Sequence, residues 1–282
     1  MLDNGTLPHE GANRERTIIV VPGLLTQTGQ WKTRPPELLE GKAARAAAKG
    51  WYDAVEKARG AMDCDVRVFD WPRRSWWQVL RGAAESANSY RTAAPWLGPG
   101  TAFAFEFVKG LVQFVREREA FILDCQTAAV ELRKAIDKLD RDVVVIGHSA
   151  GARVAWLASQ GLANPARALY LLAPAVGQKE EGFDRRPRLR DDGDAYVVYS
   201  HADLAFQVGF NRDFPLGASV GGAGLDPRRL GYDCLRTSEL LREDIGHTEY
   251  AKHLQLLLRG DGQHRVQLEW KRLEAEWSAS RR

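Results

Sequence analysis

Five short runs of β-branched and apolar residues recur along the chain, and longer segments of a different pattern separate them. The runs are Thr17–Val21, Val66–Phe69, Val143–Ile146, Ala168–Leu172 and Ala195–Tyr199. Continuous apolar runs, without a polar residue at every second position, are typical of parallel strands buried on both faces of a sheet. The pattern therefore predicts a mostly parallel sheet at the centre of the protein.

The segments between these runs carry apolar residues at helical spacing. They are Pro36–Arg59, Phe121–Leu139, Ala150–Leu162 and Thr248–Arg259. Strands that alternate with helices predict βαβ units. We therefore expect an α/β fold with a doubly wound, mostly parallel sheet and helices on both faces.

One long segment interrupts the alternation of strands and helices. About fifty residues, Trp71–Ala120, separate two predicted strands, and a single crossover helix needs far fewer. We expect an insertion at about residues 71–120 within one domain that covers residues 17–260. Residues 1–16 predict a flexible N-terminal tail, and residues 261–282 a polar C-terminal extension.

The insertion also concentrates the aromatic residues of the chain. Eleven of the 26 aromatic residues lie between Phe69 and Phe121. They predict either a cap or lid that binds an apolar group, or packing between the insertion and the sheet. The candidate substrate-binding side chains are Trp76, Trp77, Trp96, Phe103 and Phe107.

Composition excludes several classes of function. The 40 Lys and Arg residues nearly balance 37 Asp and Glu, which argues against a nucleic-acid binder. The three Cys are widely spaced, so neither a disulfide framework nor a metal site is expected. Residues 1–16 contain no apolar run of a secretory signal, and Ala93–Val115 contains prolines and charges that disfavour a transmembrane span. We expect a cytoplasmic protein with a small-molecule substrate and no cofactor; composition leaves the oligomeric state open.

A motif with chemical meaning follows the predicted strand at Val143–Ile146. Residues Gly147-His148-Ser149-Ala150-Gly151 form a G-x-S-x-G sequence that an Ala-rich helical segment follows. This pattern is typical of a sharp strand-to-helix turn that exposes the serine hydroxyl above the sheet. A second match at Gly217–Gly221 has no predicted strand before it and no predicted helix after it, so we expect a loop there.

A serine nucleophile needs a base, and the base needs an acid that orients it. Of the six histidines, His247 follows a glycine in a loop that opens a predicted helix, a suitable place for the base. Asp203 comes just after the strand Ala195–Tyr199, at the edge where catalytic groups collect in open α/β sheets. Asp213, Asp226 and Asp233 are competing acids in less defined loops.

Together these residues resemble the α/β-hydrolase superfamily, of the serine-esterase or lipase kind. The resemblance covers roughly residues 17–260 and depends on Ile18–Gly23, the GHSAG motif, Asp203 and His247. The order serine, aspartate, histidine along the chain is the order of this family.

The resemblance implies an oxyanion hole made by the backbone N–H groups of Leu24 and Ala150. Pro22-Gly23 stands where many relatives have His-Gly, and the long glycine run of one esterase branch is absent. The expected activity is hydrolysis of a carboxylic ester with an apolar acyl group, through an acyl-enzyme. The same residues also fit a thioesterase, an acyltransferase or a non-catalytic binding protein on this fold.

Overall fold

The structure is a computed structural model of the chain. It describes residues 16–23, 35–71, 121–139, 141–178, 186–203, 220–224 and 232–279. The predicted substrate-binding aromatic side chains, residues 72–120 of the predicted insertion, and most of the predicted N-terminal tail lie outside these ranges. Arg16, which the sequence places in the tail, begins the first strand.

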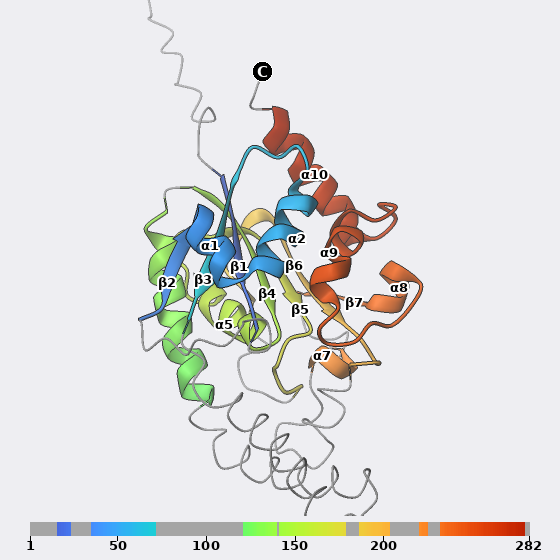
Figure 1. Ribbon diagram of the computed structural model, residues 1–282, viewed down its shortest axis with the longest axis horizontal. Coiled ribbons are helices and arrows are strands. Elements are labelled where there is room, and N and C mark those ends of the chain that lie inside the picture. The colour runs from blue at the N-terminus through green and yellow to red at the C-terminus, as the bar shows by residue number, and fades with distance from the viewer. Residues whose placement is uncertain are drawn as a thin grey trace, which may run out of the picture.

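Within the described residues, a seven-stranded sheet forms the centre of the protein, in the order β2-β3-β1-β4-β5-β6-β7 (Figure 1). Its strands are β1 (Arg16–Val21), β2 (Glu37–Glu40), β3 (Asp65–Asp70), β4 (Asp142–His148), β5 (Ala166–Leu172), β6 (Leu189–Tyr199) and β7 (Asp233–Arg236). The edge strand β2 runs antiparallel to β3, and all the other neighbouring pairs are parallel. The predicted mostly parallel sheet is confirmed.

Helices cover both faces of this sheet, as the sequence predicts. They are α1 (Gly41–Ala47), α2 (Lys49–Arg59), α5 (Ala150–Ser159), α7 (Val220–Ala223), α8 (Thr237–Leu241), α9 (Tyr250–Arg259) and α10 (Arg265–Ala279), together with a helical segment at residues 121–137. No helix in these described ranges is both long enough and apolar enough to cross a bilayer.

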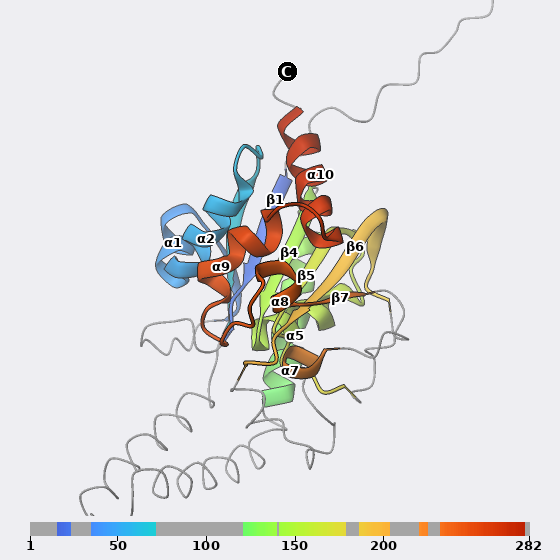
Figure 2. The ribbon, with the colours of Figure 1, turned by 90° about the vertical axis from the view of Figure 1, so that its right-hand side faces the viewer.

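Alternate residues of each strand supply the two hydrophobic cores. In β1, Ile18 and Val20 pack in the core that includes α1, α2, α9 and α10. Ile19 and Val21, one residue on, pack in the core with α5 and the helical segment at residues 121–137. Figure 2 shows α1, α2 and α9 together on one side of the sheet. Because β1 is buried on both faces, its sequence is a continuous apolar run.

The first helical prediction is wrong at its beginning. The sequence predicts a single helix over Pro36–Arg59, but Glu37–Glu40 form the edge strand β2 and the helices begin at Gly41. In β2, Leu38 packs toward one core and Leu39 toward the other, while the two glutamates are exposed. Pairing with β3 decides this segment, because its four residues carry no strong strand propensity of their own.

The end of the chain also differs from the predicted polar extension. Helix α10 buries Val266, Trp270, Leu273 and Trp277, each at most 1% exposed, in the core on the α9 side of the sheet. The Nε1–H of Trp270 donates to the carbonyl of Ala58 at 3.0 Å, which ties α10 to α2. Residues spaced by four, three and four form one face of a helix, so the polar residues lie on its outer face. The described part of this segment belongs to the folded core.

Replacing Trp270 by alanine should therefore destabilise the protein strongly. Removing a fully buried Trp side chain costs about 3–5 kcal/mol of unfolding free energy. Denaturation with guanidinium chloride measures the loss. Leu268→Ala, on the same helix but at a side chain 52% exposed, is the matched control and should change the stability by less than about 0.5 kcal/mol. Similar losses in both variants would contradict the packing of α10 described above.

Candidate active site

Ser149 occupies a strained backbone position between β4 and α5. Its φ of 56° and ψ of −122° lie in a region that residues with a side chain rarely adopt, at a cost of about 1–3 kcal/mol. The surrounding backbone holds it there. The Ser149 N–H donates to the carbonyl of Leu172 at 2.9 Å, and its own carbonyl accepts from the N–H groups of Ala152 and Ala175, each at 3.1 Å. The Ser149 side chain is therefore left to interact outside the turn.

Glycines let three backbone segments meet at this turn. A Cβ on Gly151 would lie 2.0 Å from the carbonyl oxygen of Val21, and one on Gly147 would lie 2.6 Å from the Cα of Ala152. A Cβ on Gly23 would lie 2.7 Å from the Cβ of Ser149. The contact of Gly151 brings α5 against the end of β1. The contact of Gly23 brings the residues after β1 against Ser149. The two glycines of the G-x-S-x-G motif are thus required by close packing.

The structure brings together the three side chains that the sequence predicts as catalytic. Nε2 of His247 lies 2.9 Å from Oγ of Ser149, and Nδ1 of His247 lies 2.7 Å from Oδ2 of Asp203. A carboxylate only accepts, so Nδ1 carries the proton and donates to Asp203. Nε2 is then free to accept the hydroxyl proton of Ser149. In such a chain an imidazole can activate a serine hydroxyl as a nucleophile.

Asp203 lies in a turn after the carboxyl end of β6. The turn is closed by the Ala202 N–H, which donates to Oγ of Ser200 at 3.2 Å. Asp203 is completely buried, Ser149 is 8% exposed and His247 is 9% exposed. These three residues are therefore largely removed from water, which strengthens their electrostatic interactions.

The loop that carries His247 is braced on both sides of the histidine. On one side, Asp244 accepts hydrogen bonds from Nε of Arg236 at 3.0 Å and from Oγ1 of Thr237 at 3.1 Å. The bond from Arg236 lowers the pKa of the Asp244 carboxyl below its usual value. After the histidine, Oε2 of Glu249 accepts a hydrogen bond from the Gly246 N–H at 2.8 Å and so closes the loop around His247. This network attaches the loop to β7, α8 and the start of α9.

His148, which precedes the serine, packs beneath this loop. Its Nε2 lies 3.1 Å from the carbonyl oxygen of His247. Its ring is 4.8 Å from that of Trp51 on α2 and 5.5 Å from that of Tyr250 on α9, measured between centroids. Burial, together with the neighbouring His247, lowers the pKa of His148 well below its usual value.

The sequence also predicts two oxyanion donors and three competing acids. Ala150 is the first residue of α5 and is completely buried; N–H groups in the first turn of a helix have no intrahelical partner. Leu24 lies outside the described residues, as do the competing acids Asp213 and Asp226. Asp233, the third competing acid, pairs instead with Arg265 at 3.3 Å.

The second G-x-S-x-G match is only partly described. Val220 and Gly221 begin the short helix α7, where the sequence predicts a loop, and Ser219 lies outside the described residues. The Val220 N–H donates to the carbonyl of Val176 at 2.8 Å, a tertiary contact that a local pattern cannot reveal.

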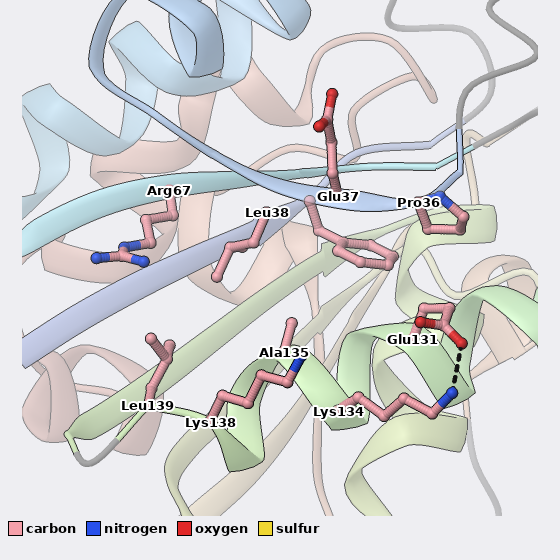
Figure 3. Close-up of a pocket in the computed structure, with 10 residues that line it drawn as sticks. Pro36, Glu37, Leu38, Arg67, Glu131, Lys134, Ala135, Lys138 and Leu139 are labelled. Carbon is pink, nitrogen blue, oxygen red and sulfur yellow. Dashed lines mark hydrogen bonds and ion pairs between the residues drawn. The ribbon is translucent and has the colours of Figure 1, made fainter.

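A pocket of about 290 Å³ lies at the β2 edge of the sheet, between β2 and the helical segment at residues 121–137 (Figure 3). Its lining includes Leu38, Phe69 and Leu139, along with an ion pair between Lys134 and Glu131 at 2.8 Å. Of the predicted site residues that the structure describes, none lines it, and β1 separates β3 from the strand that leads to Ser149. We therefore place the candidate site at Ser149.

Sequence reasoning missed the residues that support the histidine. In the sequence, Trp51 and Tyr250 occupy ordinary apolar positions of two helices. Their contact with His148 depends on how α2 and α9 pack. Asp244 and Arg236 lie eight residues apart in the sequence, so a charge pair just before a predicted base was a usable signal. The close approach of Gly23 to Ser149 follows from the parallel register of β1 and β4, in which Val21 pairs with Gly147.

No protein-family model matches the chain, and no curated protein matches it either. Among solved structures, it is similar to an alpha/beta hydrolase enzyme from a Medee basin deep-sea metagenome library. The identity is 14%, over 94% of this chain and 85% of that chain, with a TM-score of 0.35.

Two fungal enzymes are also similar to it. Lipase B of Aspergillus fumigatus is 12% identical over 94% of this chain and 62% of that chain, with a TM-score of 0.43. Carboxyl esterase 2 of the mycorrhizal fungus Tuber melanosporum is 13% identical over 95% of this chain and 79% of that chain, with a TM-score of 0.38. At these values the likenesses concern the fold alone, and any function of this chain depends on its own site.

The close packing at the turn predicts the effect of a substitution at Gly23. Gly23→Ala should lower the free energy of unfolding by about 1–3 kcal/mol, because its Cβ would overlap the Cβ of Ser149. Gly50→Ala is the matched control. Gly50 lies within α2 with open space around it, so alanine should raise the stability by about 0.5–1 kcal/mol. Urea denaturation of both variants measures the difference, and a Gly23→Ala variant as stable as the wild type would refute the close approach.

Proposed function

We propose that this protein is a serine hydrolase that cleaves a carboxylic ester through an acyl-enzyme intermediate. The observation that carries the proposal is the hydrogen-bonded chain from Ser149 through His247 to Asp203. These two hydrogen bonds join a hydroxyl, an imidazole and a carboxylate in the order that nucleophilic acyl transfer needs. The strained turn at Ser149 supports it, because backbone strain of this kind collects at functional sites.

Each residue has one role in the proposed reaction. Oγ of Ser149 attacks the carbonyl carbon of the ester while Nε2 of His247 takes the hydroxyl proton. His247 then gives this proton to the leaving alcohol, and the acyl group stays on Ser149. Water, activated by the same imidazole, attacks the acyl-enzyme and releases the acid. Asp203 keeps the proton of His247 on Nδ1 and stabilises the imidazolium that forms in each step.

The negative charge that develops on the carbonyl oxygen needs hydrogen-bond donors. The backbone N–H of Ala150 belongs to the first turn of α5, next to Ser149, where N–H groups are free and the helix dipole favours an anion. We assign the second donor to the N–H of Leu24, one residue after Gly23. Removing one such donor typically costs about 2.7–4 kcal/mol of transition-state stabilisation.

The first test is covalent labelling with a fluorophosphonate, which reacts with activated serines. We expect labelling of the wild type and no labelling of Ser149→Ala. Hydrolysis of an aryl ester should fall by about 10⁴-fold or more in Ser149→Ala, and by a similar factor in Asp203→Asn, which leaves His247 in the wrong tautomer.

Ser159→Ala is the control for this experiment. Ser159 lies at the end of the same helix, and its hydroxyl donates to the carbonyl of Trp156 at 2.7 Å, away from the site. This variant should be labelled like the wild type. Equal labelling of the wild type and Ser149→Ala would overturn the proposal, and the absence of any labelling would favour a binding protein without catalysis.

The substrate class is proposed from the sequence. The aromatic side chains between Phe69 and Phe121 favour an apolar acyl group. In a series of aryl esters of rising acyl length, kcat/KM should increase by about 15-fold for each two methylene groups until the acyl site is filled, since one buried CH₂ contributes about 0.8 kcal/mol. A flat response over the series would contradict an apolar acyl site. Faster turnover of matched thioesters would move the substrate class to thioesters.

A further inference from the structure

His148 and Ser149, two consecutive residues, hold opposite ends of one histidine. Oγ of Ser149 is 2.9 Å from Nε2 of His247, and Nε2 of His148 is 3.1 Å from the backbone carbonyl oxygen of His247. We infer that His148 is a positioning residue, which fixes the main chain of His247 so that its imidazole stays aligned with Ser149. This inference rests on the serine-hydrolase function proposed above.

The direction of this hydrogen bond is set by chemistry. A carbonyl oxygen only accepts, so Nε2 of His148 must carry a proton. Nδ1 of His148 is buried and has no hydrogen-bond partner within the described residues. Nδ1 points toward Gly23, since a Cβ on Gly23 would lie 3.1 Å from it. The neutral form with the proton on Nε2 is the one that satisfies the donor, and the low pKa that burial imposes on His148 favours a neutral ring.

The rings around His148 leave it little freedom to move. Its residue is 2% exposed, and Trp51 and Tyr250, at 2% and 0%, contact it from two helices. The third ring is that of His247, with centroids 4.9 Å apart. Because α2 and α9 pack directly against each other, the His148 ring is enclosed where they meet β4. Such a ring offers its N–H at a fixed point in space.

This fixed donor completes the bracing of the loop. Asp244 fixes the loop to Arg236, and Glu249 fixes the N–H of Gly246, and both fixed points precede His247 in the chain. The bond from His148 acts on the peptide of His247. Small displacements of a catalytic group reduce the rate sharply, because the reacting atoms must lie in near-attack geometry. His148 should therefore affect kcat while leaving substrate affinity almost unchanged.

The test compares two substitutions that have nearly the same shape. His148→Gln keeps an N–H donor at about the reach of Nε2, whereas His148→Met has a similar length and no donor. Both lose the ring contacts, so their difference isolates the hydrogen bond. We expect His148→Gln to retain kcat within about threefold of the wild type, and His148→Met to fall about tenfold below His148→Gln, with KM within about twofold in both.

A second measurement does not depend on activity. The proton that His247 Nδ1 shares with Asp203 gives a resolved downfield NMR signal when it is held in a strong, water-excluded hydrogen bond. The signal should persist in His148→Gln and broaden in His148→Met. His253→Gln, which replaces a histidine of α9 outside the site, should match the wild type in both measurements.

Equal kcat values and equal NMR signals in His148→Gln and His148→Met would overturn the inference. Equal losses in thermal stability and kcat for both variants would assign His148 to packing alone. Should His148→Met not fold, His148→Leu takes its place as the variant without a donor. A wild type that neither hydrolyses esters nor reacts with the fluorophosphonate would refute the proposed function, while the NMR comparison would still report on the placement of His247.

Discussion

The left-handed turn at Ser149 imposes the geometry of the whole site. A residue with a side chain adopts such a conformation only when its surroundings fix it, and here hydrogen bonds from β5 and from the first turn of α5 do so. The turn also demands that the end of β1 pass within contact distance of α5. Gly151 meets that demand, because any side chain there would overlap the carbonyl of Val21. The central parallel strands and the helix after β4 are thus fixed relative to each other by one turn.

The order of strands then decides which loops can reach the serine. β4 lies between β1 and β5, and β6 follows next, so the loops after four parallel strands open at the same edge of the sheet. Ser149 follows β4 and Asp203 follows β6, at the edge where ligands bind in open α/β sheets. His247 lies in the loop between α8 and α9, and these two helices hold it in place. The hydrogen-bonded chain therefore joins residues 44 and 98 positions apart, and it exists only in the folded protein.

Sequence predicted the parts of this fold that are encoded locally. The central strands are continuous apolar runs because both their faces are buried, and the G-x-S-x-G turn needs its glycines within five residues. β2 and β7 were missed, since their strand form depends on pairing with β3 and β6. The burial of α10 was missed because charged residues dominate the composition of the segment, although Val266, Trp270, Leu273 and Trp277 share one face. Ser149, Asp203 and His247, which the structure brings together, were predicted from their positions at element ends. The contact of His148 with the His247 peptide was not, because it depends on the packing of two helices.

Asp203 shows how closely stability and chemistry are joined in this site. A carboxylate removed from water costs several kcal/mol unless it is paired or hydrogen-bonded. Asp203 is fully buried, and the side-chain partner that the described residues provide is Nδ1 of His247. The hydrogen bond that orients the imidazole therefore also compensates part of this cost, at Oδ2; Oδ1 is buried without a hydrogen-bond partner among the described residues. If His247 moved away, the buried Asp203 carboxylate would lose this hydrogen bond. The contacts of the loop with Arg236, Glu249 and His148 therefore stabilise Asp203 and His247 together. The same interactions that hold the loop in the folded state thus keep the imidazole ready beside Ser149.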